Sequence, residues 1–171
     1  MKRSIPIVWG LVKLAIGGWA WWYLFAAGQV PAGQMPLADE AAMRDAFHKN
    51  VSRNRIVALL SPTTPADLAT AQQLQALLME YENDTLDAHV VWQPLLDTDW
   101  APTTDAMARV WDPRVRHYWD KEKTLRALVG EGRIFVYARG AGLNNPAVRV
   151  TDWKTGWPKI REFLGTPKKM R

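Results

Sequence analysis

The chain has 171 residues, with 22 Lys and Arg against 17 Asp and Glu, and no cysteine. The absence of cysteine excludes disulfides, thiolate metal sites and thiol catalysis. The formal charge is +5, but six of the bases lie near the two ends, at Lys2, Arg3, Lys13, Lys168, Lys169 and Arg171. The nearly neutral body between them argues against a nucleic-acid-binding surface, which clusters its cations on one folded face.

The first 38 residues contain no acid and predict a membrane anchor. Residues 5–28 are apolar except for Lys13, and a helix of this length spans about 36 Å, more than a bilayer core of roughly 30 Å. Basic residues precede the run and none follows it closely, so the positive-inside rule predicts a cytoplasmic N-terminus and a periplasmic C-terminal domain. We therefore expect a single-pass protein of the inner membrane, with residues 1–28 as its cytoplasmic end and transmembrane helix.

Aromatic residues near both ends of this run suit the interfacial belts of a membrane helix. They are Trp9 at the inner end and Trp19, Trp21, Trp22 and Tyr23 at the outer end. A cleaved signal peptide is the alternative, because Ala26, Ala27 and Gly28 offer small residues at a cleavage site. The length of the apolar run and its Trp-rich end favour a retained anchor.

Lys13 is the one charge within the predicted span. A lysine at the centre of a span costs on the order of 2.5 to 3.5 kcal/mol, unless its side chain reaches the inner interface. One helical face carries Gly10, Lys13, Gly17 and Ala20. Small residues let another helix approach closely, so this face predicts packing on a partner membrane helix or a lipid headgroup. Snorkelling of Lys13 to the interface is slightly favoured over this packing.

After the anchor, residues 29–38 form a linker rich in Pro and Gly, and residues 39–165 carry alternating strand and helix patterns. Helices are predicted over 39–51, 65–81, 104–110, 113–128 and 157–164, and strands over 55–60, 87–96, 133–138 and 147–150. Pro158 is expected near the first turn of the last helix, and residues 166–171 form a basic tail. A parallel strand, helix, strand crossover followed by a hairpin predicts one α/β domain with a mixed sheet flanked by helices.

The stretch SPTTPADL, from Ser61 to Leu68, lies between the first predicted strand and the helix that follows. Thr64 suits the N-cap, Pro65 the first helical position and Asp67 the third, which predicts a capping box. The hydroxyls have no sequence-adjacent base, and neither a G-x-S-x-G elbow nor a phosphate-binding glycine loop is present. The turn therefore predicts helix capping rather than catalysis.

Three stretches carry a resemblance to a known family. RIVALLSPTTPADL, DAHVVWQPLLDTDW and WDPRVRHYWD resemble bacterial, often exported, thioredoxin-like proteins in which a Ser-Pro-Thr-Cys-Pro-x-Cys-like turn follows the first strand. The resemblance covers about residues 55–120 and implies a thioredoxin-like fold. On it, Thr64 and Asp67 occupy the positions of the two cysteines, which removes the thiol exchange that the family implies. The proline expected opposite the turn is not evident, because Pro113 and Pro146 are poorly placed for it.

The other chemistry-bearing residues predict no catalytic residue, no metal and no cofactor. No ligand-like pair occurs among the three histidines, His48, His89 and His117. His117 and Asp120 are three apart and could share a helix face, although a solvated pair is favoured over a metal site. Asp97 and Asp99, with Asp120 near, could pair as carboxylates, although a solvated loop is favoured over a catalytic pair.

Tryptophan is abundant for a chain of this size. Six of the ten lie beyond the linker, at Trp92, Trp100, Trp111, Trp119, Trp153 and Trp157. Trp is enriched in binding hot spots, and Trp100, in a loop with Pro102, is expected to be exposed or to contact a partner. Together with the anchor, this predicts a non-enzymatic accessory subunit of an integral membrane complex, with a photosynthetic or respiratory electron-transport complex as a natural host. A membrane-tethered binding module or chaperone that uses the groove around residues 62–65 is the alternative, and a thiol-independent enzyme is a distant third.

Overall fold

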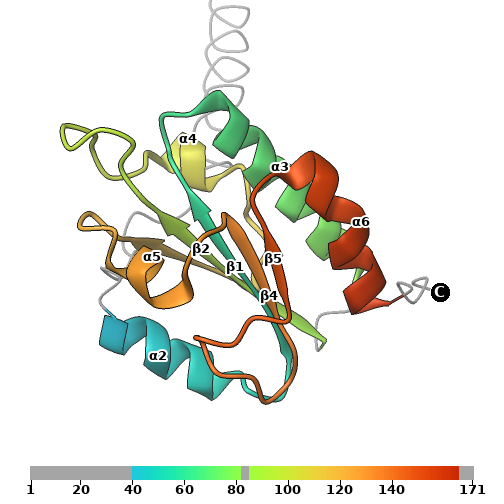
Figure 1. Ribbon diagram of the computed structural model, residues 1–171. Helices are drawn as coiled ribbons and strands as arrows, with labels where there is room; N and C mark the ends of the chain where they lie inside the picture. Colours follow the sequence, from blue (N-terminus) through green and yellow to red (C-terminus); the bar gives the residue numbers. More distant parts are fainter. Residues whose placement is uncertain (1–39, 82–84, 166–171) are drawn as a thin grey trace, which may run out of the picture.

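The computed structural model describes residues 40–81 and 85–165 (Figure 1). Their elements, in chain order, are α2 (Glu40–Lys49), β1 (Asn54–Leu60), α3 (Pro65–Glu80), β2 (Leu86–Trp92), α4 (Thr104–Met107), β3 (Val115–Trp119), α5 (Thr124–Val129), β4 (Ile134–Tyr137), β5 (Val148–Val150) and α6 (Trp153–Leu164). Several predictions lie outside these residues: the anchor 1–28, the linker 29–38, the tail 166–171, the packing face Gly10, Lys13, Gly17 and Ala20, and the aromatics Trp9, Trp19, Trp21, Trp22 and Tyr23. Within the two described ranges, no helix combines the length and apolarity that crossing a bilayer requires.

The sheet is built around β1, whose residues from Arg55 to Leu60 are all buried. Burial of both strand faces is expected where helices cover the two sides of a sheet. The strand order is β3-β2-β1-β4-β5. β1, β2 and β3 run parallel, whereas β4 is antiparallel to β1 and β5 is antiparallel to β4. The parallel crossover and the closing hairpin predicted from the sequence are both confirmed.

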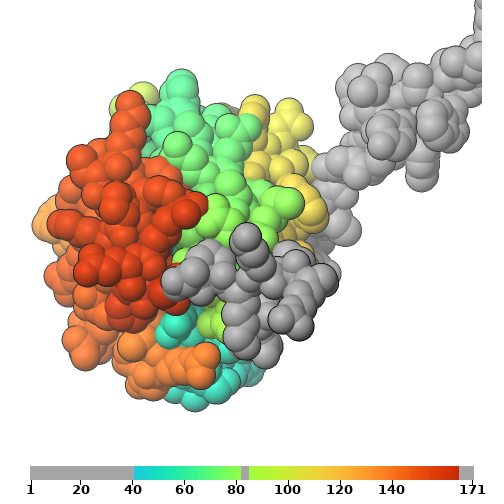
Figure 2. Space-filling view, turned by 90° about the vertical axis from the view of Figure 1, so that its right-hand side faces the viewer, coloured from blue at the N-terminus to red at the C-terminus, as the bar shows by residue number. Residues whose placement is uncertain are grey.

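Alternate residues of β1 enter two different cores, because successive side chains of a strand point to opposite faces. Ile56, Ala58 and Leu60 belong to the core beneath α3 and α6. Val57 and Leu59 belong to the core beneath α2 and α5. Figures 1 and 2 show α3 and α6 side by side over the first face of the sheet, and Figure 1 shows α2 and α5 at the other. The continuous apolar run RIVALL therefore specifies a strand that lies between two layers of helices.

The arrangement of these elements is a thioredoxin-like fold. β1, α3 and β2 form a parallel unit, and β4, β5 and α6 return on the other side of β1, with β4 antiparallel to it. β3 extends this sheet at the free edge of β2. The mixed sheet flanked by helices, expected from the sequence, is confirmed.

The helix predicted over residues 113–128 is wrong. The structure has β3 from Val115 to Trp119 there, followed by the short helix α5. Valine, tyrosine and tryptophan favour strands, and β3 pairs along β2 from Ala88 opposite Val115 to Trp92 opposite Trp119. Pairing with the open edge of β2 outweighs the helical spacing of the apolar residues in this stretch.

The last helix begins at Trp153, four residues before its predicted start. Asp152 is its N-cap and accepts hydrogen bonds from the backbone N–H groups of Lys154 and Thr155. Pro158 therefore lies inside the helix rather than in its first turn, and it cannot donate to the carbonyl of Lys154. The cap at Asp152 explains why the helix starts earlier than the proline suggests.

A buried arginine ties α2 to the sheet. The guanidinium of Arg55, on β1, donates to the carbonyl oxygens of Phe47, Ala138 and Ala141, each at 2.9 Å. It also lies 4.0 Å from the centre of the Phe47 ring. Burial lowers the pKa of Arg55, but the three carbonyls satisfy much of its hydrogen-bonding capacity. This arginine joins α2, β1 and the loop after β4.

His89 is fully buried on β2. Its ring stacks on that of Tyr118, and its Nδ1 lies 3.3 Å from the tyrosine hydroxyl oxygen. Burial, aided by the positive charges of Arg116 and Arg55, lowers the pKa of His89 to about 3. The ring is therefore neutral at pH 7, and its place is in the core rather than in a functional site.

Candidate functional site

The turn from Ser61 to Thr64 joins the end of β1 to α3, and its backbone matches the sequence prediction. Thr64 is the N-cap, with φ −95° and ψ 119°, and Pro65 is the first helical residue. The side chain of Thr64, however, makes no capping hydrogen bond, and its Oγ1 is buried without a hydrogen-bond partner. The predicted capping box is therefore wrong in its side-chain contacts, although the helix begins at the expected residue.

Asp67 binds other groups than the capping box requires. Its Oδ2 accepts a hydrogen bond from the backbone N–H of Ser61 at 2.9 Å, and its Oδ1 pairs with the guanidinium of Arg133. Asp67 is buried, whereas 49% of the Arg133 side chain is exposed. A buried carboxylate is stabilised more by a cation than by one further backbone donor. This explains why Asp67 pairs with Arg133 and does not form the capping box. The contact links the first turn of α3 to β1 and to the residue before β4.

The hydroxyl groups of the turn are not arranged for nucleophilic attack. Ser61 Oγ lies 3.1 Å from Thr63 Oγ1, which is in turn 3.2 Å from Asp99 Oδ2. A hydroxyl nucleophile is commonly activated by a histidine, and in the described part of the chain these hydroxyls have no hydrogen bond to one. The carboxylate oxygen of Asp99 that Thr63 reaches also accepts two backbone N–H groups of its own loop. With no cysteine in the chain, the turn cannot exchange thiols and disulfides.

The segment beside Asp67 contains Gly132 and Arg133 where the resemblance leads one to expect a proline. Gly132 has φ +143°, and a Cβ there would lie 2.9 Å from a ring carbon of Phe135, so only glycine fits. Pro113 precedes β3, and Pro146 lies between β4 and β5. No peptide bond is cis within residues 40–81 and 85–165.

A cleft of about 130 Å³ lies between this turn, the end of β2 and α5. Its lining residues are Leu59, Leu60, Ser61, Asp67, Gln93, Pro94, Leu95, Lys123, Arg126, Gly132 and Arg133. Cofactors and drug-sized ligands occupy pockets of roughly 300–1,000 Å³, so the cleft suits one side chain or a small ion. Three of its lining residues are cations, and its one carboxylate, Asp67, is already paired.

The loop after β2 lies beside this cleft and is shaped by Asp99. Asp99 Oδ2 accepts hydrogen bonds from the backbone N–H groups of Leu95 at 2.7 Å and Leu96 at 3.0 Å, in addition to its contact with Thr63. The hydrogen bond from Leu96 is the largest effect that lowers the pKa of Asp99, and the charge of Lys123 adds to it. Asp99 thus orders the loop and does not act with the exposed Asp97 as a carboxylate pair.

The exposure of the tryptophans divides them into core and surface residues. Trp100, on this loop, is 88% exposed. Trp111, which the sequence did not single out, is 62% exposed. Trp92, Trp119 and Trp153 are buried and belong to the core beneath α3 and α6. Trp157 is partly buried against the same core. The two exposed indoles are therefore the surface tryptophans of the described residues.

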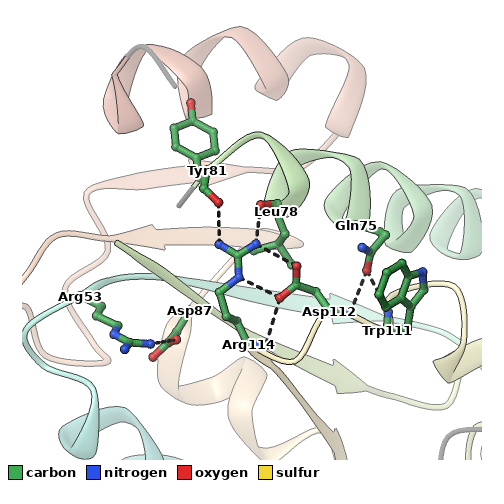
Figure 3. A network of polar contacts seen from close by, with 8 residues as sticks. All are labelled: Arg53, Gln75, Leu78, Tyr81, Asp87, Trp111, Asp112 and Arg114. Carbon is green, nitrogen blue, oxygen red and sulfur yellow. Dashed lines mark hydrogen bonds and ion pairs between the residues drawn. The ribbon is translucent and has the colours of Figure 1, made fainter. Parts of the chain in front are cut away.

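The Asp-Pro-Arg stretch closes the C-terminal end of α3 (Figure 3). Arg114 contacts both carboxylate oxygens of Asp112 at 2.8 Å, and it donates to the carbonyls of Tyr81, at 2.9 Å, and Leu78. Carbonyls at a helix C-terminus have no donor within the helix, so the guanidinium satisfies them. Gln75 Oε1 accepts two backbone N–H bonds from the same loop at 2.9 Å. The stretch that carried the resemblance is thus a structural cap.

The predicted helix-face pair of His117 and Asp120 is wrong, because His117 lies on β3 and Asp120 follows it. His117 Nδ1 accepts from Trp92 Nε1 at 3.1 Å, and its Nε2 lies 3.1 Å from the carbonyl of Val110. Burial lowers the pKa of His117, so the ring is neutral and donates from Nε2. Asp120 instead accepts from the backbone N–H of Thr124 at 2.9 Å and so begins α5. No group of three potential metal ligands occurs in residues 40–81 and 85–165.

Comparisons with known proteins found similarity among solved structures. No family model and no curated protein sequence matches the chain. Among solved structures, it is similar to a thioredoxin-like protein from Neisseria meningitidis, with 13% identity, a TM-score of 0.47, and coverage of 68% of this chain and 77% of the other. It is also similar to a secreted disulfide oxidoreductase of Mycobacterium tuberculosis, homologous to DsbE of E. coli, with 13% identity, a TM-score of 0.39, and coverage of 62% and 79%. The sheet topology and the composition define the class of protein: a thioredoxin-like domain without cysteine.

Proposed function

We propose that the protein is a non-enzymatic accessory subunit of an integral membrane complex, and that its thioredoxin-like domain holds a partner in the periplasm. The observation that carries the proposal is the contact of Asp67. The position that the resemblance assigns to the second cysteine holds a buried carboxylate bonded to Ser61 and Arg133. This residue stabilises the face on which a thioredoxin would perform its chemistry.

Exposed apolar side chains next to this face support a role in binding. Leu95, Leu96 and Trp100 are 62%, 63% and 88% exposed, on a loop that Asp99 orders. Large apolar residues held in one conformation lose little entropy on binding, and tryptophan is common among the residues that dominate interface energy. This loop is the surface that we assign to partner contact.

The apolar run at residues 5–28 supports the membrane part of the proposal. A helix there, with its N-terminus in the cytoplasm, would fix the domain to the periplasmic side of the inner membrane. The face with Gly10, Lys13 and Gly17 would pack against a helix of the host complex. A photosynthetic or respiratory electron-transport complex is the host that we favour.

Purification of the full-length chain from its native membrane in mild detergent tests the proposal. We expect stoichiometric association with one large complex, and weaker association after Lys13→Leu, Gly17→Leu or Trp100→Ala. Trp111→Ala is the matched control, since it removes an exposed indole away from the cleft. A monomer with transient clients would favour the tethered binding module or chaperone instead, and turnover of a small molecule would refute the non-enzymatic role.

A further inference from the structure

The cleft beside the turn contains two cations that form no ion pair within the described residues. Lys123 and Arg126 both line it, and neither side chain has an ion-pair or hydrogen-bond partner in the part of the chain that the structure describes. The third cation, Arg133, is paired with Asp67. The cleft is therefore lined by three positive groups and a single carboxylate.

The neighbouring acids do not cancel this charge by direct contact. Asp99 uses Oδ2 for the N–H groups of Leu95 and Leu96 and for Thr63. Asp120 is buried behind Gln93, whose Nε2 donates to it at 2.8 Å, and its oxygens also accept bonds from the start of α5. Both carboxylates are committed to backbone structure, so the cleft offers donors to a ligand.

The backbone conformation of Lys123, the N-cap residue of α5, is unusual for a lysine. This residue has φ +55° and ψ 32°, and it is the one non-glycine residue with positive φ in the described ranges. Glycine or asparagine adopts this region at lower cost than a long side chain does. Strained residues of this kind cluster at functional sites, and here the strain lies at the edge of a cationic cleft.

Three exposed apolar residues, which we call the rim, lie on the loop that reaches the same cleft. Leu95 lines it, and Leu96 and Trp100 follow on the loop fixed by Asp99. A free inorganic anion would make no apolar contacts with such a rim. A nucleic acid would need a larger basic surface than these cations provide. A protein segment with one acidic side chain between apolar ones matches both the charge and the rim.

We propose that the cleft binds an aspartate or glutamate side chain of a partner protein, with Lys123 and Arg126 holding the carboxylate and the rim of Leu95, Leu96 and Trp100 packing on its apolar neighbours. The inference rests on the proposed role in partner binding and names the chemistry of the partner. Arg133 belongs to the same wall of the cleft, where its pairing with Asp67 keeps it in position.

An array of immobilised octapeptides of random sequence, probed with the full-length protein in detergent, tests the inference. We expect bound peptides to be enriched in Asp and Glu next to apolar residues. The best of them should bind about tenfold more weakly to the double variant Lys123→Asn, Arg126→Gln, which removes two partly exposed charge contacts. Asparagine is chosen at 123 because it tolerates positive φ.

The control variant is Lys159→Gln, which removes an exposed cation on α6, away from the cleft. It should bind the same peptides as the unchanged protein. Replacement of Glu by Gln in the best peptide should weaken binding as much as the double variant does. Sodium acetate and inorganic phosphate, added at the same ionic strength as a chloride reference, should compete little, which separates a protein carboxylate from a free anion.

Two results would overturn the inference. The first is an array that shows no enrichment in acidic residues, whether or not it binds any peptide. The second is an acidic enrichment that the double variant leaves unchanged. Strong competition by acetate or phosphate would assign the cleft to a small free anion instead. If the double variant still co-purifies with the host complex while peptide selectivity is absent, the acidic-partner inference fails and the accessory role stands. If co-purification fails for the unchanged protein, the accessory role is the part that is wrong.

Discussion

The two ends of α3 each meet an aspartate–arginine pair, and the pairs differ in what surrounds them. At the N-terminal end, Asp67 pairs with Arg133, whose side chain is 49% exposed at the cleft. At the C-terminal end, Asp112 pairs with Arg114, and the two side chains are only 8% and 6% exposed. The side chain of the second arginine also donates to the carbonyls of Leu78 and Tyr81, whereas the side chain of the first makes no other hydrogen bond within the described residues.

This difference shows that an aspartate–arginine pair can have different structural roles at the two ends of one helix. Removal of one partner from a buried pair leaves an unpaired charge in a medium of low polarity, and the cost is large. A half-exposed pair is screened by water and contributes little to stability. The C-terminal pair therefore holds the fold, and the N-terminal pair orders a surface that remains open to a ligand.

The largest expected effect is at the buried pair. Arg114→Met should lower the free energy of unfolding by about 3–5 kcal/mol, because Asp112 and the carbonyls of Leu78 and Tyr81 lose the guanidinium that donates to them. Urea unfolding of the full-length protein in detergent at pH 7.5 measures it. Arg109→Gln, an exposed arginine just upstream, is the control and should change little. A loss below about 1 kcal/mol for Arg114→Met would remove the distinction between the two ends.

The next largest expected effect is a dependence of stability on pH, because the protonation of His89 is coupled to folding. Its pKa of about 3 in the folded protein lies below the ordinary value of 6.5. Between these values the unfolded chain binds the proton and the folded chain does not, so stability is complete above about pH 6.5 and falls as the pH drops toward 3. We expect a loss of about 2 kcal/mol at pH 5 relative to pH 7.5. His117, whose pKa burial also lowers, adds a loss of the same sign.

Urea unfolding at both pH values, for the unchanged protein and for His89→Phe, isolates this linkage. The variant should lose most of the pH dependence, whereas His48→Gln, on the exposed side of α2, should retain it. Hydrogen bonds from Arg114 lower the pKa of Asp112 below its ordinary 3.8, so the buried pair stays charged over this range. An unchanged pH dependence in His89→Phe would contradict the assignment.

At the open end of α3 the expected effect is smaller. Arg133→Gln should cost about 1 kcal/mol, because Asp67 keeps the N–H of Ser61 and water can reach the carboxylate through the cleft. The exposed pair Arg161–Glu80 supplies the control, and Arg161→Gln should change stability less. A loss for Arg133→Gln as large as that for Arg114→Met would mean that both ends are structural.

The smallest expected effect is at Thr64. Substitution there should not lower stability, whereas substitution of a capping threonine would. The Oγ1 of Thr64 is buried and unpaired, so Thr64→Val replaces a hydroxyl that has no partner with a methyl group of similar size. Stability should stay within about 0.5 kcal/mol of the unchanged protein or rise, as judged by the melting temperature in detergent. A loss of about 1 kcal/mol or more would restore Thr64 as a capping side chain.

The sequence was sufficient for features that rest on local patterns. The apolar run of β1 and the helical spacing after Pro65 predict the parallel crossover, and the turn chemistry predicts where α3 begins. β3 was missed because a strand at a sheet edge is decided by its neighbour, here β2, and not by its own spacing. Trp111 was missed because nothing in its local sequence distinguishes a surface tryptophan from a core one.

The site was less predictable than the fold, because its contacts join distant parts of the chain. Asp67 and Arg133 are 66 residues apart, and no local pattern pairs them. The local sequence fits a capping box equally well, because it does not show that Arg133, the residue before β4, lies beside Asp67. Lys123 and Arg126 were expected within one long helix, so their meeting with the turn could not be foreseen.

The two bonds of Asp67 also bear on whether this domain could acquire redox chemistry. A single change to cysteine at 67 would deprive both the N–H of Ser61 and the guanidinium of Arg133 of their acceptor. A single change at 64 would supply one thiol with no second thiol to close a disulfide. Each first step thus loses stability or gains no activity, so a dithiol could form in this turn only through disadvantaged intermediates. The carboxylate makes a gain of dithiol chemistry difficult.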